Sequence, residues 1–369
     1  MKLAIARWIE HQWSKPNAPV WHVLTWPLQF FFKHLSYARR LYFKTKAQGP
    51  QCPVIVVGNI HVGGMGKSPV VQSLAIALAQ QQLAVGILLR GYQGQHTQTI
   101  LLTSNTTALD VGDEAVMHFQ RFQAAAQQQA IITPLVMVDA HRVRGAFALE
   151  RLKVDVIICD DGLQHYKLAR DFEVVMMDSQ QRPGQSHLLP TGSLREPITR
   201  LNDVDLVLTQ GPLHKDWFDQ VPDLDAKHWL YTTQMDLPVE IDFTAKTELA
   251  CPLQPCQIHV ISAIARPQRV FQGLQDQGFT VIKHVFMDHY QFLKQDIIDF
   301  LALDGPLVVT AKDLVKIKPL VEQCLINGSV KTAEVRSRLY LIPFQAILNP
   351  DMVQQMYSTA LCRATFRLF

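Results

Sequence analysis

The chain has 369 residues, of which 48% are hydrophobic, so it is long enough to bury two cores. Its net charge is only +3, and eight Lys and Arg against one acid give residues 1–50 a charge of +7. The rest of the chain is therefore mildly acidic, which excludes a general nucleic-acid-binding surface. The six cysteines form no C-x-x-C pair, which favours a reduced protein on the cytosolic side over a disulfide framework or a zinc site.

The N-terminal segment, residues 1–50, is rich in aromatic and basic side chains. It holds four of the six tryptophans, which are Trp8, Trp13, Trp21 and Trp26. The uncharged stretch 16–32 is too short, and too often interrupted by proline, to predict a membrane-spanning helix. Aromatic and basic residues together favour a helical arm that lies on a membrane surface. The alternative is an arm whose aromatic residues simply pack on the rest of the chain.

A strand, a glycine-rich turn and the start of a helix follow one another at residues 54–69. This order is typical of loops that hold nucleotide phosphates, because backbone N–H groups and a helix N-terminus close around the anion. The backbone of residues 61–68 would cradle the phosphates, Lys67 would reach the outer ones, and Ser68 would coordinate Mg²⁺. Glycine five residues before Gly66 is usual, but His61 stands there, and a plain glycine-rich turn is the alternative. The expected phosphate contacts are His61, Val62, Gly63, Gly64, Met65, Gly66, Lys67 and Ser68.

From residue 53 onward, strand and helix patterns alternate along the chain. Apolar runs predict strands, helical patterns lie between several of them, and a second such set begins at residue 258. The alternation predicts an α/β fold, with a P-loop NTPase-like, mostly parallel sheet flanked by helices and a second, smaller α/β lobe. We expect the arm at 1–50, the P-loop core at 51–225, and the lobe that closes the cleft at 226–369. The six strands expected in the core are 53–57, 84–89, 134–138, 154–159, 173–177 and 205–209.

Two acidic residues, Asp160 and Asp161, directly follow the hydrophobic strand at 154–159. Ligands of such sheets bind at the carboxyl ends of the strands, where these carboxylates would meet the phosphates. Magnesium needs one or two carboxylate oxygens in addition to phosphate oxygens, so the pair predicts a metal site. An Asp-Asp-Gly turn is the alternative.

Several motifs occur in a shared order, which are the phosphate loop followed by Pro69, then 112–114, 160–171, 188–197, 265–269, 288–289 and 310–313. Together they resemble one family, and the resemblance covers about residues 53–317. The chain is similar to the tetraacyldisaccharide 4′-kinases, the lipid A 4′-kinases of Gram-negative bacteria. The resemblance implies transfer of the γ-phosphoryl group of ATP, with Mg²⁺, to the 4′-hydroxyl of a tetraacylated glucosamine disaccharide 1-phosphate, which gives lipid IVA.

The resemblance also assigns roles to individual residues. It matches Asp113 to the catalytic base and His289 to the histidine paired with that base, and it adds Glu196 to the metal site. A helix N-cap is the alternative for Asp113, and a polar loop residue is the alternative for His289.

Basic side chains near the expected site add weaker candidates. Arg90 and Arg195 would stabilise phosphate charge, although structural ion pairs are equally open to them, and both rank below Lys67. Gln164 and His165 are expected to line the cleft. Arg142 and Arg144 face either an anionic substrate group or solvent.

The aromatic arm resembles the membrane-docking N-terminus of the family. This implies a peripheral or monotopic protein on the cytoplasmic face of the bacterial inner membrane, with no nucleic acid and no stable protein partner. A membrane-recruited regulatory P-loop ATPase is the main alternative, and a small-molecule kinase or ligase on the same fold is another. Regulatory ATPases often carry lysine before the paired glycines, whereas this chain has Val62.

Overall fold

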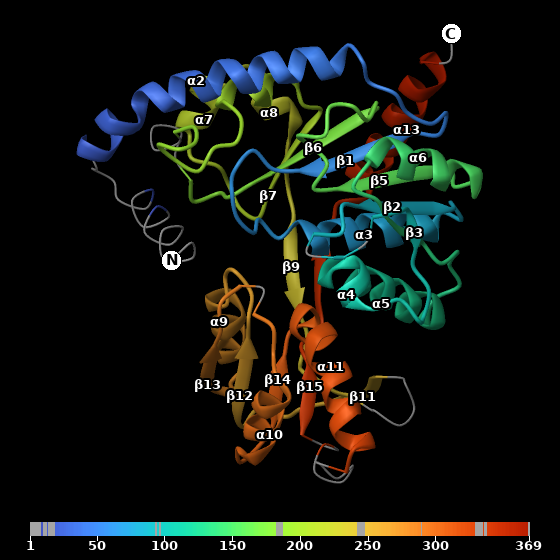
Figure 1. Cartoon of the computed structure of the whole chain (residues 1–369), viewed down its shortest axis with the longest axis vertical. Helices are drawn as coiled ribbons and strands as arrows, with labels where there is room; N and C mark the ends of the chain where they lie inside the picture. Colours follow the sequence, from blue (N-terminus) through green and yellow to red (C-terminus); the bar gives the residue numbers. More distant parts are fainter. Residues whose placement is uncertain are drawn as a thin grey trace.

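The computed structural model describes residues 9, 13, 19–92, 94–95, 97–181, 187–241, 248–288, 290–328, 335 and 338–367. Two lobes lie one above the other in Figure 1, and helix α2 (Pro19–Lys44) runs across the upper lobe. Each lobe is built around its own sheet, and a two-stranded sheet joins them.

The upper lobe contains an eight-stranded sheet in the order β3-β4-β2-β5-β1-β6-β7-β8. All neighbouring strands are parallel except the pair β3–β4 at the edge. Strands β1 and β5 are fully buried because helices cover both faces, as in other parallel sheets. The strands are β1 (Val54–Gly58), β2 (Val85–Leu89), β3 (Ile100–Leu101), β4 (Leu135–Val138), β5 (Val156–Asp160), β6 (Phe172–Met177), β7 (Leu206–Thr209) and β8 (His228–Leu230).

Alternate residues of the central strand β1 belong to different cores. Ile55 and Val57 face the core shared with α3 (Lys67–Gln80), α5 (Asp113–Gln128) and α13 (Pro350–Phe366). Val54 and Val56 face the opposite core. The helices that contribute to that second core are α6 (Arg142–Arg151), α7 (Asp216–Gln220), α8 (Leu224–Lys227) and the 3₁₀ helix η2 (Ile198–Asp203), while α4 (Ala108–Val111) lies in a connection.

The lower lobe contains a six-stranded sheet in the order β11-β10-β15-β14-β12-β13. Its strands β12, β13, β14 and β15 are parallel, and β10 and β11 add antiparallel pairs at one edge. The elements are β10 (Val239–Ile241), β11 (Glu248–Pro252), β12 (Gln257–Ser262), α9 (Gln268–Asp276), β13 (Thr280–Val285), α10 (Lys294–Ala302), β14 (Leu307–Val309), α11 (Ala311–Ile326) and β15 (Leu339–Leu341). The strands β9 (Thr232–Met235) and β16 (Phe344–Ile347) pair with each other between the two lobes.

The α/β fold with a mostly parallel sheet is as predicted, and the six core strands lie where the apolar runs predict them. The structure differs from the expected boundary at residue 225 in two places. Strand β8 pairs with β7 in the upper sheet, and α13 packs against β1 and α3. Both follow residue 225, since the chain returns from the lower lobe to cover the upper core, a long-range contact that local patterns do not predict.

Helix α2 packs with one face on the loops around residues 188–204 and exposes the other. Trp21 Nε1 donates a hydrogen bond to the Thr191 carbonyl at 3.0 Å, and Phe32 packs against the upper core. Among the described residues, no helix is long and apolar enough to cross a membrane. The exposed apolar face comprises Val23, Leu24, Trp26, Leu28, Phe30, Phe31, Leu35, Tyr37, Leu41 and Tyr42.

Candidate active site

The glycine-rich segment at residues 59–66, hereafter the phosphate loop, joins the buried strand β1 to the first turn of α3. Gly66 caps α3 in the left-handed conformation, with φ at 71°, which a side chain would strain. The backbone N–H groups of the first turn of α3 have no partners within the helix, so an anion can bind there at the positive end of the helix.

The backbone groups of the first residues of the phosphate loop pair with the neighbouring segment 193–195. The Val62 N–H donates to the Ser193 carbonyl at 2.8 Å, His61 forms a β-bridge with Leu194, and the Arg195 N–H donates to the Ile60 carbonyl at 2.7 Å. The structure therefore differs from the prediction that His61 and Val62 contact phosphate. Residues 63–68 line the cavity described below, and His61 and Val62 do not.

Lys67 is held toward the cavity by two acceptors. Its Nζ lies 3.1 Å from Asp161 Oδ1 and 3.4 Å from Asn59 Oδ1, while Asp161 Oδ2 lies 3.8 Å from Arg195. Burial opposes ionisation of Asp161, but the charges of Lys67 and Arg195 outweigh it and hold the pKa of this carboxyl below its ordinary value. One carboxylate thus keeps two cations in place beside the phosphate loop.

Asp160 lies buried at the end of β5, and its two carboxylate oxygens have different surroundings. Its Oδ2 lies 3.0 Å from Nε2 of His118 on α5, and both side chains are buried. Its Oδ1 has no hydrogen-bond partner in the described part of the chain, although it is buried. A buried carboxylate oxygen left unpaired fits a magnesium ligand. Within the described ranges no three His, Cys, Asp or Glu form a metal cluster.

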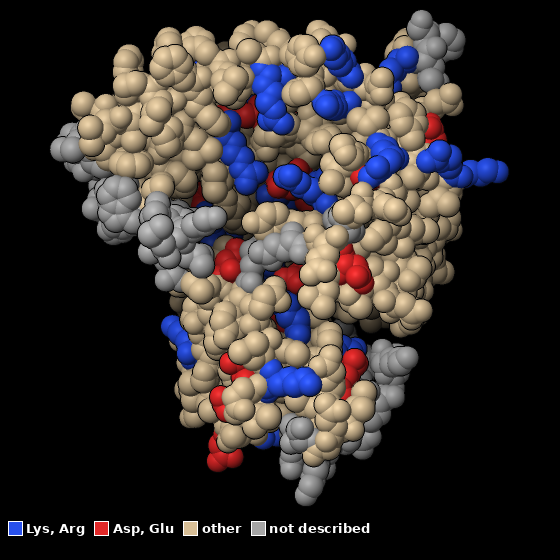
Figure 2. Space-filling view, viewed as in Figure 1, with Lys and Arg blue, Asp and Glu red and all other residues tan. Residues whose placement is uncertain are grey.

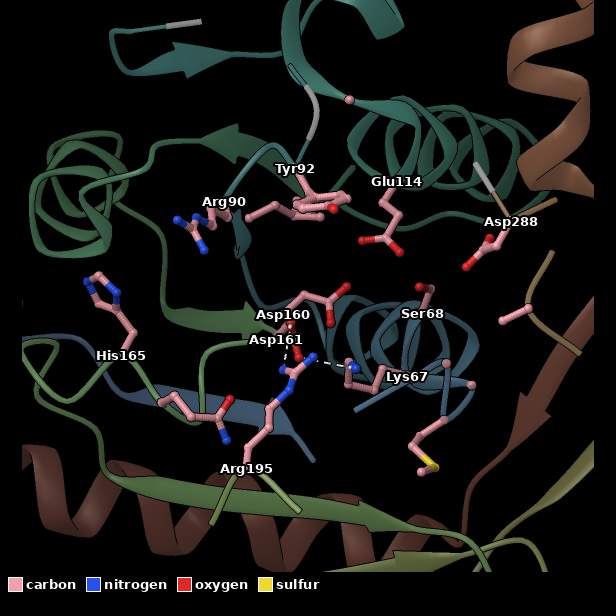
Figure 3. Close-up of a pocket in the computed structure, with 18 of the residues that line it drawn as sticks. Lys67, Ser68, Arg90, Tyr92, Glu114, Asp160, Asp161, His165, Arg195 and Asp288 are labelled. Atoms are coloured by element: carbon pink, nitrogen blue, oxygen red, sulfur yellow. Dashed lines mark ion pairs between the residues drawn. The ribbon is translucent and has the colours of Figure 1, made fainter. Parts of the chain in front are cut away.

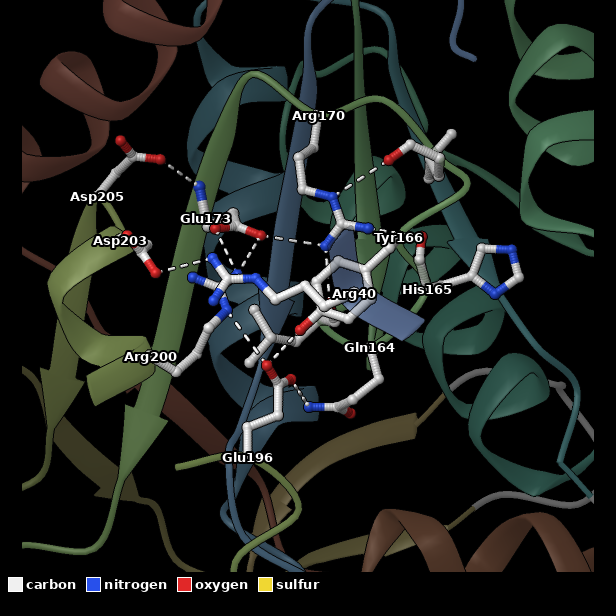
Figure 4. Close-up of polar contacts among 12 residues, drawn as sticks. Arg40, Gln164, His165, Tyr166, Arg170, Glu173, Glu196, Arg200, Asp203 and Asp205 are labelled. Carbon is white, nitrogen blue, oxygen red and sulfur yellow. Dashed lines mark hydrogen bonds and ion pairs between the residues drawn. The ribbon is translucent and has the colours of Figure 1, made fainter. Parts of the chain in front are cut away.

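Glu196 is already occupied by protein groups. Its Oε1 accepts from Gln164 Nε2 at 2.8 Å, and its Oε2 accepts from the Tyr166 hydroxyl and lies 3.3 Å from Arg200 Nε. Figure 4 shows these groups in one network, which reaches α2 through Arg40 over the Tyr166 ring. Gln164 Nε2 also donates to the Asn59 carbonyl at 3.0 Å, so Glu196 fixes the base of the phosphate loop. Glu196 thus lines the cavity beside Asp160 and Asp161, but both of its carboxylate oxygens contact protein groups.

The acids at the start of α5 point in different directions. Asp113 is buried and does not line the cavity, whereas Glu114 does. Burial, together with the negative charge of Asp160, raises the pKa of Glu114. A Cβ added at Gly112 would lie 2.3 Å from the Tyr92 carbonyl oxygen, so only glycine lets the 91–92 turn approach the helix start this closely. His289, the expected partner of Asp113, lies outside the described residues.

One cavity of about 1130 Å³ lies between the lobes, with α2 along one side. It is lined by residues 63–68, Glu114, Asp160, Asp161, Gln164, Arg195 and Glu196. Figure 2 shows it as a hollow below α2, with Lys and Arg side chains at its rim and acidic side chains inside. In Figure 3, Glu114, Ser68 and Asp160 point into a common space, with Lys67 and Arg195 across from them.

The opposite end of the cavity is more basic. Arg90 and His165 lie there, away from Ser68 (Figure 3). Burial lowers the pKa of His165 to about 4, and the surrounding arginines, Arg142, Arg170, Arg39 and Arg90, act in the same direction. Arg142 also lines this end, although its guanidinium donates to the Asp139 and Asp160 carbonyls at 3.2 and 3.1 Å. Arg144 instead pairs with Asp139 and does not line the cavity. The uneven charge favours an anionic group at this end.

Two residues of the site were not identified from the sequence. His118 holds Asp160, and Asn59 links the Gly63 carbonyl to Lys67. A signal for His118 was present, because it follows Glu114 by four residues and therefore lies on the same face of the helix. No comparable local signal marks Asn59, whose partners are defined by the fold of the loop.

The buried His61 makes stability depend on pH. Neither ring nitrogen has a hydrogen-bond partner among the residues that the structure describes. Burial lowers the pKa of His61 from 6.5 to about 4, nearby Arg266 and Arg195 add to this, and Asp178 opposes it. His61 binds a proton near pH 6.5 in the unfolded chain and near pH 4 in the folded chain. Protonation therefore favours the unfolded chain as the pH falls below 6.5, and the folded chain is most stable with respect to His61 above that pH.

We therefore expect His61 to cost on the order of 3 kcal/mol of unfolding free energy between pH 7 and pH 4. Urea unfolding of the His61→Phe variant should show a flatter pH dependence over this range than that of the wild type. His141→Gln, at an exposed position, serves as the control and should leave the pH dependence unchanged. An equally steep fall in His61→Phe would assign the acid lability to other groups.

Comparison with known proteins identifies the family. The family model described as tetraacyldisaccharide-1-P 4′-kinase (LpxK) matches residues 21–359. The chain belongs to this family. Members are ATP-dependent kinases of lipid A biosynthesis, so the chain is a kinase enzyme.

Named relatives agree with this assignment, and a solved structure shares the fold. A tetraacyldisaccharide 4′-kinase from Psychrobacter cryohalolentis is 32% identical over 372 residues, which cover 94% of each chain. One from Shewanella sp. (strain MR-4) is 38% identical over 346 residues, which cover 91% of this chain and 92% of the relative. LpxK from Aquifex aeolicus, whose crystal structure is described as a complex with ATP, shares the fold with a TM-score of 0.67 at 22% identity, covering 92% of this chain and 99% of that one. The LpxK fold thus extends over both lobes.

Proposed function

We propose that the cavity between the lobes is where this kinase transfers the γ-phosphoryl group of ATP to the 4′-hydroxyl of a tetraacylated glucosamine disaccharide 1-phosphate. The observation that carries the proposal is that one cavity connects the phosphate loop and the acids after β5 with the side of α2. Nucleotide and lipid acceptor would thus meet in one space, with the nucleotide at the end marked by Lys67 and the lipid at the end beside α2.

At the nucleotide end, the backbone of residues 63–68 and the Lys67 ammonium would hold the β- and γ-phosphates, with Arg195 beside them. The groups suited to Mg²⁺ are the Ser68 hydroxyl, the unpaired Asp160 oxygen and Asp161. When bound, the ion neutralises phosphate charge. Glu196 would hold Gln164 and the loop base rather than the ion.

At the other end, the anionic 1-phosphate of the acceptor would lie near Arg90, with His165 and the buried Arg142 nearby. The low pKa of His165 supports this assignment, because it reflects a basic surrounding that favours an anion. The 4′-hydroxyl would then extend toward the nucleotide, where Asp113, by resemblance paired with His289, would orient it or accept its proton. Asp113 lies one residue from the cavity-lining Glu114, so any such step acts at the start of α5.

The exposed face of α2 is proposed to lie on the cytoplasmic side of the inner membrane, so that the acyl chains of the acceptor remain among lipids. In this proposal residues 1–50 dock, the P-loop core binds ATP, and the lower lobe closes over it. The support is an apolar face that the fold leaves exposed, together with the basic charge of this segment. The site would therefore draw its substrate directly from the bilayer.

Substitution on this face should weaken membrane binding. Phe31 and Leu35 are each 70% exposed and one helical turn apart, so Phe31→Glu with Leu35→Glu removes two apolar contacts with little effect on folding. We expect about 10²-fold weaker binding to vesicles containing anionic lipid, measured by co-sedimentation. The matched control is Val285→Glu with Leu293→Glu, two exposed apolar residues of the lower lobe. Equal binding by both double variants would contradict docking through α2.

The transfer itself is tested with γ-labelled ATP and the disaccharide 1-phosphate in detergent. We expect label at the 4′ position of the lipid, with a rate that depends on added Mg²⁺. Label released only as inorganic phosphate would instead indicate a regulatory ATPase.

A further inference from the structure

An arginine of the lower lobe lies against the phosphate loop. Arg266 follows β12 in the turn before α9 and lines the cavity, as does its neighbour Ala265. A Cβ added at Gly64 would lie 3.3 Å from the Ala265 Cβ, so this turn and the phosphate loop are in contact. Arg266 is thus presented to the loop by the lobe that does not carry the loop.

The partner of Arg266 is an acid of the upper lobe. Arg266 Nη1 donates to Oδ2 of Asp178 at 2.6 Å, and Asp178 directly follows β6, the neighbour of β1 in the sheet. Among the described residues Arg266 donates to no other acceptor, so the rest of its guanidinium is available to a ligand. Asp178 does not line the cavity.

The cations around the phosphate loop share their acidic partners in pairs. Lys67 and Arg195 of the upper lobe share Asp161, and Arg266 and Arg269 of the lower lobe share Asp178 at 2.6 and 4.0 Å. Two cations from each lobe thus lie beside the place where nucleotide phosphates would bind. Phosphoryl transfer requires such charge, because negative charge spreads over the oxygens of the transferred group.

An ion pair that merely joins the lobes does not account for this placement. The Arg266 side chain is 40% exposed, and pairs of this kind contribute little stability. The lobes are also joined by the packing of α5 against α11 and by the strand pair β9–β16. Arg269 is the weaker candidate, since it is more exposed and donates to Gln210 at 2.9 Å.

We propose that Arg266 is a catalytic residue supplied by the lower lobe, which contacts the γ-phosphoryl group of bound ATP and which Asp178 holds in place when no nucleotide is bound. Its planar guanidinium would pair with two phosphate oxygens. On this view the exchange of one acidic partner for another, carboxylate for phosphate, links nucleotide binding to the approach of the two lobes. The inference rests on the phosphate position proposed above.

The test compares Arg266→Ala, Arg266→Lys and Asp178→Asn. We expect Arg266→Ala to lower kcat about 10²-fold, and Arg266→Lys to retain part of the activity. In equilibrium binding without turnover, Arg266→Ala should weaken a non-hydrolysable ATP analogue about tenfold and leave ADP binding unchanged, because ADP lacks the γ-phosphoryl group. Asp178→Asn releases Arg266 and should tighten the analogue about two- to fivefold.

The matched control is Arg363→Ala, which removes an ion pair of the same length, 2.6 Å to Asp205, from an exposed site outside the cavity. It should leave kcat and both affinities unchanged. Equal losses of kcat and of analogue affinity in Arg266→Ala and Asp178→Asn would overturn the proposal, because they would indicate an ion pair that only holds the lobes together. Equal weakening of ADP and the analogue by Arg266→Ala would overturn it as well, and so would no change in either. If Arg266→Ala does not fold, Arg266→Lys decides by the same comparison. The proposed phosphate position is tested separately, because Lys67→Ala should lose ADP binding if that position is right. Unchanged ADP binding in Lys67→Ala would contradict the phosphate position, whereas the results above concern Arg266 alone.

Discussion

The Lys67→Ala variant should transfer phosphate about 10³-fold more slowly than the wild-type kinase. Lys67 is the first residue of α3, and Asp161 and Asn59 already hold its ammonium group toward the cavity. The charge is therefore in place before the nucleotide arrives, and the protein needs little reorganisation when negative charge develops on the phosphates. Removal of the ammonium also leaves Asp161 without its closest cation, which adds repulsion toward an incoming phosphate.

The measurement is the initial rate of label transfer at saturating ATP, together with the affinity for ADP. Lys283→Ala is the matched control, because Lys283 is exposed on the lower lobe and does not line the cavity. We expect Lys67→Arg to keep the charge but to place it poorly, with activity between that of the wild type and Lys67→Ala. A kcat for Lys67→Ala within tenfold of the wild type would show that the phosphates lie elsewhere.

The parts of the site that were predicted from the sequence are those defined by short stretches of chain. A buried β-branched strand, glycines and Gly-Lys-Ser predict the phosphate loop, because the strand, turn and helix follow within a few residues. Asp160 and Asp161 were predicted from the sequence for a similar reason, since the end of a parallel strand determines which edge of the sheet they occupy. Both features are present at neighbouring strands, β1 and β5.

The parts that the sequence did not predict depend on contacts between distant segments. The Val62 N–H is taken by Ser193, more than a hundred residues later, and Glu196 is taken by Tyr166 and Arg200. Neither contact leaves a periodic or local signal. The same reason applies to α13, whose helix is simple to predict but whose packing on β1 is not.

Helix α2 connects the proposed membrane surface with the site more directly than the aromatic composition indicated. Arg40 pairs with Asp203 at 2.8 Å and lies over the ring of Tyr166, whose hydroxyl donates to Glu196. Glu196 in turn holds Gln164, which contacts the base of the phosphate loop. A displacement of α2 would thus be felt at the nucleotide end, which gives the docking segment a part in forming the site as well as in locating it.

The Asp113→Asn variant should lose about 10²- to 10⁴-fold in kcat, while its affinity for ADP stays unchanged. Asn has nearly the same shape and keeps a polar group at the start of α5, so thermal unfolding should change little. The comparison with Glu114→Gln is decisive, because Glu114 lines the cavity and has a raised pKa, whereas Asp113 is buried beside it. We expect Glu114→Gln to alter the Mg²⁺ concentration needed for half-maximal activity and to keep the acid limb of the pH–rate profile.

Asp113→Asn should instead lower kcat at every Mg²⁺ concentration, since the proposed proton acceptor is gone. The two variants thus separate a proton acceptor from a neighbour that tunes the charge of the metal site. If Glu114→Gln removes the acid limb and Asp113→Asn keeps both the limb and the rate, the base is Glu114. The buried Asp113 would then serve the N-terminus of α5, where a carboxylate is stabilised by the helix dipole.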